Sequence, residues 1–562
     1  MATLTRKDAY ADFPVKKVSL YFVVLGLISL SIGTLFGPFQ ALNYANLNLY
    51  PWLQKLLPFI KSYYQGLTLH GVLNAIVFTQ LFAQGALLYL QSKEMKMLPL
   101  MGVAWAAWWL DLVGLVLAAI PLLTNDATVL YTFYPPLKGH PLFYIGAALI
   151  IVSSLVSVFL SVELWYRWKK QNPGKPTPLV SYMSVATWMM WGVAAIGLVV
   201  EAVVLLIPWS LGLLKGVDPL LSRTLFWWTG HPIVYFWLLP AYVVWYGLLP
   251  QRAGGKLISD PLARLVFLAF LIFSSPVGFH HQFADPGIDP FWKLVHTVLT
   301  MMVAVPSLIT AFSIAASLEI GARARGGRGV LGWITKLPWD DPIVLASTLG
   351  AIAFIAGGAG GIVNASFTLD YVVHNTTWIP GHFHLPVATA VTLTHFGLAA
   401  VLIPHLTGKP LVSPGLFRAG IVLWFTGMMT MAIGMHTMGL LGVPRRAWIS
   451  NIAPNLEGIY GHTALWMVLN GIAGTILLIA ATLILYVLFA TLLQKKRLSP
   501  EELPELEFAE AISGPEGRRS VKVMDRLFFW WGTALVIVLI VYMPTLVRIW
   551  STYVSAPGFR LW

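Results

Sequence analysis

Long apolar runs alternate with short polar connections over almost the whole chain. An apolar run of about 20 residues forms a helix long enough to cross the hydrocarbon core of a bilayer. The pattern predicts about thirteen such helices, and therefore an all-α, polytopic membrane protein. We expect them near residues 18–43, 66–91, 97–123, 141–166, 179–209, 224–249, 260–281, 292–320, 342–366, 379–406, 416–441, 460–494 and 524–550.

One of these runs, WIPGHFHLPVATAVTLTHFGL at residues 378–398, carries two histidines that an ordinary membrane helix lacks. At about 100° per residue, two helical positions lie about 200° apart, so His382 and His384 leave opposite faces of one helix. Such a helix can ligate two separate metal centres, one on each side. The alternative is that both are buried histidines bonded to nearby backbone groups.

The composition agrees with a membrane protein and limits the chemistry of any metal site. The 562 residues are 57% hydrophobic and only 10% charged, a profile that soluble domains of this size do not show. The absence of cysteine excludes disulfides, thiolate metal sites, iron-sulfur clusters and thioether-linked haem within this chain. Any metal must therefore be held by His, Met, Tyr or carboxylate side chains.

The net charge of +13 is spread through the connections between the apolar runs, which is typical of membrane topology and not of nucleic-acid binding. The N-terminal segment MATLTRKDAYADFPVKK is basic, and connections such as GARARGGRG fall on the same side. The positive-inside rule therefore predicts a cytoplasmic N-terminus and an outer C-terminus. We expect one integral membrane domain, 1–562, with a polar cytoplasmic connection at about 495–525 before an extra C-terminal helix near 524–550.

This topology places six of the 13 histidines at a similar depth. They lie toward the outer ends of the second, sixth, seventh and tenth predicted helices. Histidines that only satisfy the fold have no reason to share a depth, whereas neutral imidazole is a good ligand for iron and copper. The pattern therefore favours a metal site. The six are His70, His231, His280, His281, His382 and His384.

At this point the motifs carry a resemblance to a known family. HPIVY, the HH pair after Gly-Phe, HNTTWIPGHFHLPV and the later GVPRRAW resemble subunit I of the haem-copper oxidases, and most of all their B-type branch. The resemblance extends over essentially the whole chain, in helix number and in motif order. It implies a subunit I bundle with a low-spin haem, expected to be b-type, a high-spin haem, expected to be a-type, and one copper ion.

The same resemblance implies the ligands, position by position. The low-spin haem would be held by His70 and His384, and the high-spin haem by His382 on the other face of the tenth helix. The copper ion would face that second iron. Its implied ligands are His231, His280 and His281.

Tyr235 follows His231 by four residues, so it lies on the same helix face and one turn deeper. In the family this tyrosine is joined covalently to the copper-ligating histidine, and it can supply an electron and a proton when the dioxygen bond breaks. A membrane-interface tyrosine is the alternative, although the depth of Tyr235 argues against it. Nitric oxide reductases of the same superfamily lack this residue, so its presence favours dioxygen as the substrate.

The usual proton-uptake residues of the best-known branch are missing. Its glutamate is replaced here by Ile233, and its helix-eight lysine is also absent. Three tyrosines at spacings of seven and four line one face of the sixth helix, and two hydroxyl residues of the eighth helix extend that line. An aromatic packing stripe is the alternative. We predict a single path, as in the B-type branch, along Tyr235, Tyr242, Tyr246, Ser307 and Thr310.

Polar residues also lie on the outer side. Asp370 and His374 precede the tenth helix, and a pair of arginines, Arg445 and Arg446, follows the eleventh. Arginine pairs bind carboxylates in bidentate fashion, and the resemblance implies that these residues hold the haem propionates; a loop salt bridge is the alternative. Because Asn375 stands where the family often has aspartate, an outer magnesium site is in doubt.

The other buried polar residues receive no functional role. Carboxylates inside predicted helices are expected to be paired and structural, and the remaining histidines to be structural or interfacial. These are Asp111, Glu163 and Glu201, and His140, His296, His395, His405, His436 and His462.

Together these features predict the catalytic subunit of a respiratory terminal oxidase in a bacterial cytoplasmic membrane. It would reduce dioxygen to water and pump protons outward. Without cysteine the chain cannot hold a dinuclear copper site, so we expect a partner subunit II that carries it, with cytochrome c as the electron donor; a quinol oxidase is the alternative. A secondary transporter with a histidine proton relay is the alternative from another class, and it would show matched halves that this sequence lacks.

Overall fold

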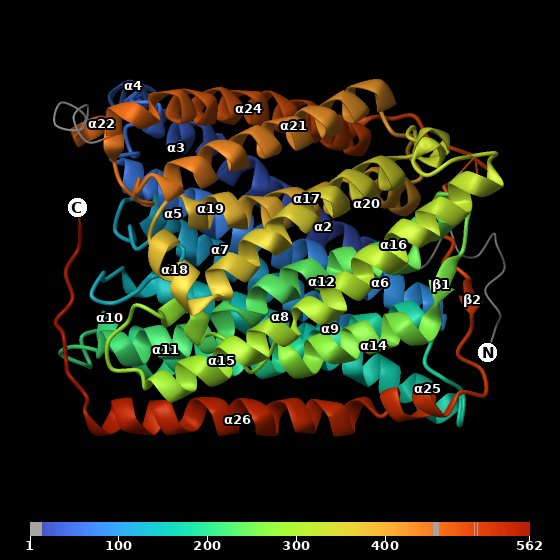
Figure 1. The fold of residues 1–562 in the computed structure, drawn as a ribbon, viewed down its shortest axis with the longest axis horizontal. Coiled ribbons are helices and arrows are strands. Elements are labelled where there is room, and N and C mark those ends of the chain that lie inside the picture. Colours follow the sequence, from blue (N-terminus) through green and yellow to red (C-terminus); the bar gives the residue numbers. More distant parts are fainter. Residues whose placement is uncertain (1–13, 453–459, 500, 503, 562) are drawn as a thin grey trace.

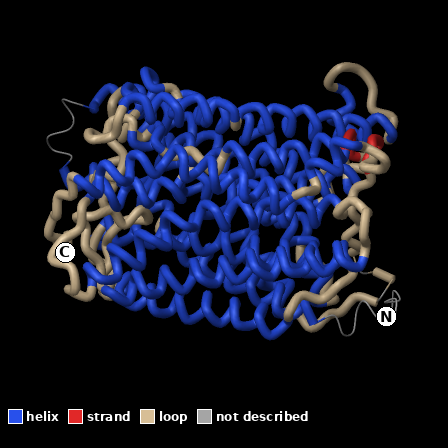
Figure 2. The backbone as a smooth tube through the Cα atoms, turned by 90° about the horizontal axis from the view of Figure 1, so that it is seen from below, coloured by secondary structure: helices blue, strands red, loops and turns tan. Residues whose placement is uncertain are grey.

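The computed structural model describes residues 14–452, 460–499, 501–502 and 504–561. Long helices lie side by side and form a bundle, with the loops gathered at its two ends (Figure 1 and Figure 2). In these residues, 11 helices are long and apolar enough to cross a membrane. Large apolar side chains such as Trp109 and Phe312 stay exposed, as expected where helices face lipid.

Most helix bounds agree with the prediction to within a few residues. The long helices and the segments that continue them are α2 Pro14–Leu35 and α3 Gly37–Tyr44; α5 Tyr63–Gly71, η1 Val72–Phe78 and α6 Thr79–Met95; α7 Met101–Leu123; α8 Pro141–Gln171; α9 Leu179–Val200, η2 Glu201–Leu206 and α10 Ile207–Ser210; α15 Pro290–Met302 and α16 Ala304–Ala324; α17 Pro342–Ala365; α19 Trp378–Phe383, η5 His384–Val391 and α20 Thr392–Thr407; α21 Pro414–Leu440; α24 Ala464–Leu493; and α26 Leu527–Ser551. The short helices between them are α4 Tyr50–Leu56, α13 Leu249–Arg252, η4 Gly332–Lys336, α18 Phe367–Val373, α22 Ile449–Ile452, η7 Gly461–Thr463 and α25 Arg519–Met524.

Two predicted helices differ from this pattern, and both carry site histidines. The helix predicted near 224–249 is two helices, α11 Pro219–Gly230 and α12 Pro232–Gly247, because the proline after His231 lacks an N–H and disrupts the helical hydrogen bonds. The helix predicted to end near 281 was wrong at its outer end, since α14 covers only Asp260–Phe273. Pro276 disfavours helical backbone before it, and a 3-10 turn, η3 Phe279–Gln282, follows.

Three π-helical segments interrupt the regular helices, and the sequence pattern did not predict them. They are η1, directly after His70, η2 and η5, which begins at His384. A π-helix has a wider turn than an α-helix, and such segments are frequent at functional sites. The constant 100° spacing assumed for residues 378–398 therefore holds only as far as His384.

The polar connection before the last helix has more structure than predicted. Its strand β2 Ala511–Ser513 pairs in parallel with β1 Leu257–Ser259, and the short helix α25 leads into α26. In Figure 1, α26 lies along one edge of the bundle, and it packs against α9, α11 and α14. The C-terminal segment lies at the end of the bundle opposite β1 and β2 (Figure 1).

Candidate metal centre

A cavity of about 980 Å³ lies within the bundle, and its walls are mainly apolar. All the predicted site residues line it except Tyr242, Tyr246 and Thr310. Residues from the two chain halves therefore meet at one site. An apolar cavity with a few convergent polar groups is the usual form of a cofactor site. The histidines that line it are His70, His231, His280, His281, His374, His382 and His384.

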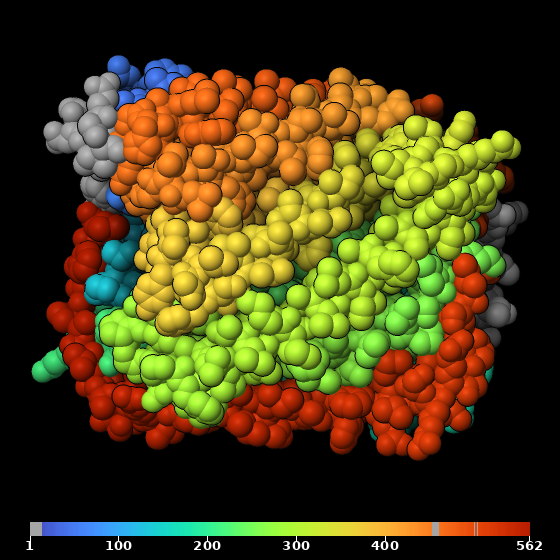
Figure 3. Space-filling view, in the orientation of Figure 1, coloured from blue at the N-terminus to red at the C-terminus, as the bar shows by residue number. Residues whose placement is uncertain are grey.

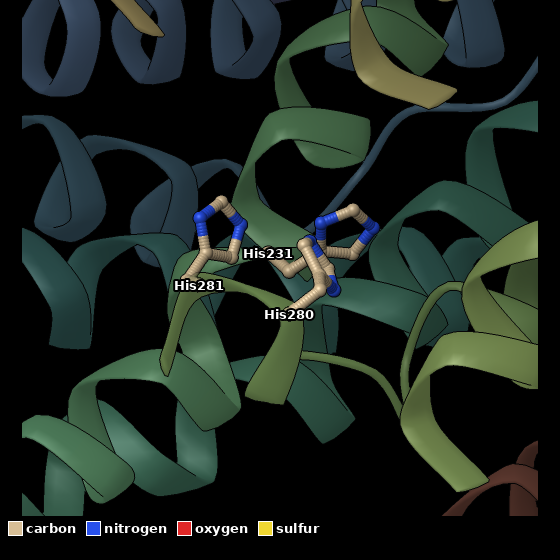
Figure 4. Close-up of side chains that lie close together, drawn as sticks. All are labelled: His231, His280 and His281. Carbon is tan, nitrogen blue, oxygen red and sulfur yellow. The ribbon is translucent and has the colours of Figure 1, made fainter. Parts of the chain in front are cut away.

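Three of these histidines form a compact cluster. His231, His280 and His281 each offer a ligand atom, and the three atoms lie within 4.8 Å of one another. Their ring centroids are 4.2 to 5.6 Å apart. Figure 4 shows the three rings converging from the α11–α12 break and from η3. The two departures from regular helix thus bring the rings together.

The surroundings of the cluster fix which ring nitrogens are available. The Thr300 hydroxyl donates to the His296 carbonyl oxygen at 2.6 Å and lies 3.1 Å from Nδ1 of His280. Nδ1 of His280 therefore donates to Thr300, which leaves its Nε2 free as a ligand. Nε2 of His231 and of His281 is buried without a hydrogen-bond partner. Neutral imidazoles with unpartnered nitrogens are a donor set that suits copper, as well as zinc, iron and nickel.

The remaining wall of the cluster is aromatic. The Trp227 ring stacks on His281, with centroids 3.7 Å apart and planes at 7°. Tyr235 packs edge-on against His231 with ring centroids 4.8 Å apart, so the predicted proximity of this pair is confirmed. The sequence did not single out Trp227 or Thr300, because neither residue type signals a metal site alone.

A second pair of histidines faces across the cavity. The rings of His70 and His384 lie 6.4 Å apart between centroids and 18° from parallel. Nδ1 of His70 is 3.0 Å from the Gly33 carbonyl oxygen, and Nδ1 of His384 is 2.6 Å from that of Pro380. Because a carbonyl only accepts, both Nδ1 atoms carry the proton and both Nε2 atoms remain free.

The spacing of this pair fits a metal ion between the rings. A metal–imidazole bond of about 2 Å on each side, plus the radius of each ring, spans nearly the observed centroid separation. Direct stacking would bring the rings closer. The pair could therefore hold one iron ion, such as that of a haem, between the two rings.

His382 lines the same cavity and precedes His384 by two residues. Its Nδ1 is 2.8 Å from the Gly357 carbonyl oxygen, so Nε2 is again available. A Cβ at Gly360 would lie 3.1 Å from Nδ1 of His382, and one at Gly361 would lie 3.2 Å from its Cε1. The glycine-rich run at 357–361 thus makes room for this imidazole. That run was a signal in the sequence that the hydropathy and histidine patterns did not bring out.

The predicted proton path is partly assembled. The Tyr246 hydroxyl donates to Thr310 Oγ1 at 3.0 Å, and Ser307 lines the cavity. The Tyr242 hydroxyl is buried beside the hydroxyls of Ser307 and Thr310 but makes no hydrogen bond of regular geometry to either. Phe270 packs against both Tyr235 and Tyr242, with centroids 5.2 and 5.7 Å away. Tyr235 and Tyr242 lie two turns, or about 10 Å, apart along α12, so no direct hydrogen bond joins them.

The outer residues gather at one rim of the cavity. His374 Nδ1 lies 2.9 Å from Asp370 Oδ2. Arg445 donates to Asn375 Oδ1 at 3.0 Å, while its Nε is buried without a partner. Burial and the neighbouring Arg446 lower the pKa of Arg445 to about 10, so it stays cationic near neutral pH. Two adjacent cations with an unpartnered donor fit an anionic group such as a carboxylate.

Several of the residues expected to be structural have local partners, although both ring nitrogens of His395 and Oε2 of Glu201 are buried without a hydrogen bond. Glu163 forms an ion pair with Arg167 one turn away, as expected. Asp111 accepts a 2.6 Å hydrogen bond from Ser153, and Glu201 one of 2.5 Å from Ser222. These two carboxylates thus pair with hydroxyls and not with cations. Among the histidines, His140 caps α8, and His296 stacks on Phe279 with centroids 3.9 Å apart.

The fold and this site define a polytopic membrane protein whose clustered histidines suit metal ions such as haem iron and copper. The family model described as cytochrome c and quinol oxidase polypeptide I matches residues 17–476. The chain belongs to that family, as a haem-copper oxidase subunit I, the catalytic subunit of an oxidoreductase. This membership decides against the transporter interpretation.

Individual relatives agree with the family. Over 558 residues the chain is 60% identical to cytochrome c oxidase subunit 1 of Thermus thermophilus, covering 98% of both. It is 26% identical over 418 residues to the Synechocystis protein of the same name, covering 69% of this chain and 70% of that one. A solved structure, titled as a heme-copper terminal oxidase dimer, is 35% identical, with TM-score 0.90 over 98% of this chain and 96% of that one.

Proposed function

We propose that the chain reduces dioxygen to water at the three-histidine cluster and His382, with electrons from cytochrome c, and that it couples this reaction to proton pumping. One observation carries the proposal: a single cavity contains both the facing pair of His70 and His384 and the cluster beside Tyr235. Dioxygen takes up electrons and protons in equal number to form water. When bound, haem iron and copper supply the redox chemistry that this requires.

We assign the ligands from the free nitrogens of the cavity. The low-spin haem, proposed to be b-type, is held by His70 and His384, and the high-spin haem, proposed to be a-type, by His382. One copper ion is held by the cluster, whose orphaned Nε2 atoms and mutual distance support the assignment. Arg445 and Arg446, with Asp370 and His374, bind the haem propionates at the rim.

The chain's own side chains prepare the site for proton and electron delivery. Thr300 and Trp227 hold two imidazoles of the cluster in place from outside, as supporting groups around metal ligands generally do. The Tyr235 ring contacts His231 of the cluster, and its hydroxyl can give up a proton there. The apolar walls limit access of water to the reacting atoms.

We propose that protons enter along Tyr246, Thr310, Tyr242 and Ser307. The hydrogen bond between Tyr246 and Thr310, and the position of Ser307 on the cavity wall, support this path. Since Tyr235 and Tyr242 lie two turns, or about 10 Å, apart along α12, a water molecule beside Ser307 must bridge the last step. The buried Tyr242 hydroxyl beside Ser307 offers that water a hydrogen bond.

We further propose thirteen spanning segments in one integral membrane domain, since α11 with α12 and the short α14 join the 11 long helices. The N-terminus would then be cytoplasmic and the C-terminus outside, in a bacterial cytoplasmic membrane. A partner subunit II would carry the dinuclear copper site. The relatives named cytochrome c oxidase support this donor, although the family description also includes quinol oxidases.

The deciding experiment is a reduced-minus-oxidised optical spectrum of the purified complex, with and without carbon monoxide, together with iron and copper analysis. We expect two irons and one copper per chain, with one haem that binds carbon monoxide. A spectrum without haem bands would refute the proposal. Oxidation rates with reduced cytochrome c and with quinol then separate the two donors.

A further inference from the structure

We propose that the connection between α16 and α17, residues 325–341, is a membrane-interface segment that inserts apolar side chains beside the headgroups of anionic phospholipids and binds those headgroups. The proposal rests on α16 and α17 being spanning helices and not on the oxidase reaction. Lipid contact at this segment is thus separable from catalysis.

The segment exposes apolar side chains that nothing in the described chain covers. Val330 is 87% exposed, Leu331 69% and Ile334 37%. The two neighbouring indoles stabilise the turn, since Trp333 Nε1 donates to the Val330 carbonyl oxygen at 2.9 Å and Trp339 Nε1 to that of Ile334 at 3.0 Å. These hydrogen bonds therefore order the loop, while its apolar side chains remain exposed. Burying such groups in the interfacial region of a membrane is favourable.

The charges of the segment select the kind of lipid. Residues 325–341 include three basic residues, and their two acidic residues, Asp340 and Asp341, follow the exposed apolar part; Asp341 pairs with Arg252 at 3.0 Å. Arg323 pairs with an acidic side chain one turn back, and Arg325 donates to a backbone carbonyl oxygen at 3.3 Å. Arg328 and Lys336 are exposed and form no ion pair among the residues that the structure describes. Basic side chains beside exposed apolar ones match a phosphate headgroup above acyl chains.

The position of the segment agrees with this ligand. It forms a protruding corner of the molecule, drawn yellow-green in Figure 3, at the same end as β1 and β2 in Figure 1. The exposed face of α16 is apolar in its first half, with Leu308 at 69% and Phe312 at 68%, and it ends in the exposed ion pair of Glu319 with Arg323. The segment therefore begins where the lipid-facing surface gives way to charge, which is the depth at which headgroups begin.

Site-directed spin labelling tests the proposal, because the chain has no native cysteine. Leu331→Cys is labelled in the intact complex and placed in nanodiscs of phosphatidylcholine with or without phosphatidylglycerol. Collision rates of the label with oxygen and with a water-soluble nickel chelate report its immersion. Phe312→Cys on α16 is the lipid-facing reference, and Glu516→Cys, exposed in the polar connection, is the water-facing one.

We expect the label at 331 to resemble that at 312, with deeper immersion in discs that contain phosphatidylglycerol. Each basic side chain at an anionic surface favours binding by roughly fivefold. The double variant Arg328→Gln, Lys336→Gln should therefore bind phosphatidylglycerol roughly 25-fold more weakly. This loss is seen as a smaller difference in label immersion between the two kinds of nanodisc, while oxidase turnover is unchanged. A label that resembles position 516, or that responds equally to both lipids, overturns the proposal. A label shielded from both quenchers in detergent overturns it too, in favour of a protein partner or a second copy.

Discussion

His70 and His384 face each other across the cavity with ring centroids 6.4 Å apart and planes at 18°. A backbone carbonyl holds each ring from behind, that of Gly33 for His70 and that of Pro380 for His384. The protein thus fixes both ring orientations independently of any bound group. This pair offers the sharpest test of the ligand assignment.

Replacing one member of the pair should remove one haem and leave the other. We expect His384→Leu to lose the low-spin haem and to lower turnover by at least roughly 100-fold, since electrons no longer reach the cluster. A carbon-monoxide-binding haem should remain in the spectrum. His395→Gln is the matched control, because His395 is a fully buried histidine of the same spanning helix that stacks on Phe82 away from the cavity. Retention of both haems in His384→Leu would show that the assignment is wrong.

The glycines beside His382 give a second prediction. In Gly360→Ala the added methyl group would lie 3.1 Å from Nδ1 of His382 and would displace its ring. We expect weaker binding of the carbon-monoxide-binding haem, seen as a lower haem content per chain. Gly532→Ala on α26, where a Cβ meets nothing within 4 Å, should keep full content. Equal haem content in the two variants would contradict this role of the glycine run.

The proposed proton path depends on the hydroxyl of Tyr246. Tyr246→Phe removes its hydrogen bond to Thr310 and should slow steady-state oxidation by at least about tenfold, since a missing proton relay slows the coupled chemistry. Tyr144→Phe is the control, because the Tyr144 hydroxyl accepts from Gly139 N away from this path. Both spectra should stay native. Turnover of Tyr246→Phe that is unchanged at every pH would exclude the path.

Most spanning segments were predictable because apolar length alone determines whether a helix crosses a membrane. The six histidines were also found in advance, since an ionisable group within an apolar run is unusual. The actual geometry of the cluster was not predictable. It depends on the break at His231 and on the end of α14 at Phe273, and the hydropathy of both regions is the same as in a continuous helix.

Other contacts were hidden for a different reason. The π-helical turns after His70 and at His384 arise from packing and leave no periodic signal in the sequence. Phe270, which belongs to another helix, packs against both Tyr235 and Tyr242. A helical wheel describes one helix at a time, so it cannot show what a neighbouring helix inserts.

The junction before the last helix gives a prediction on stability. Asp525 lies 2.6 Å from Lys169 Nζ and 3.9 Å from Nη1 of Arg264, whose side chain is almost fully buried. Asp525→Asn leaves these cations less compensated, and we expect a loss of about 1–3 kcal/mol in the free energy of unfolding.

This loss is measured by SDS-induced unfolding in mixed micelles. Asp289→Asn is the matched control, because its ion pair with Arg548 is exposed and contributes about 0–1 kcal/mol. Protease cleavage in the connection before α26 should also rise in Asp525→Asn and stay unchanged in the control. Equal unfolding curves for the two variants would show that the buried charges do not stabilise the packing of α26 against the bundle.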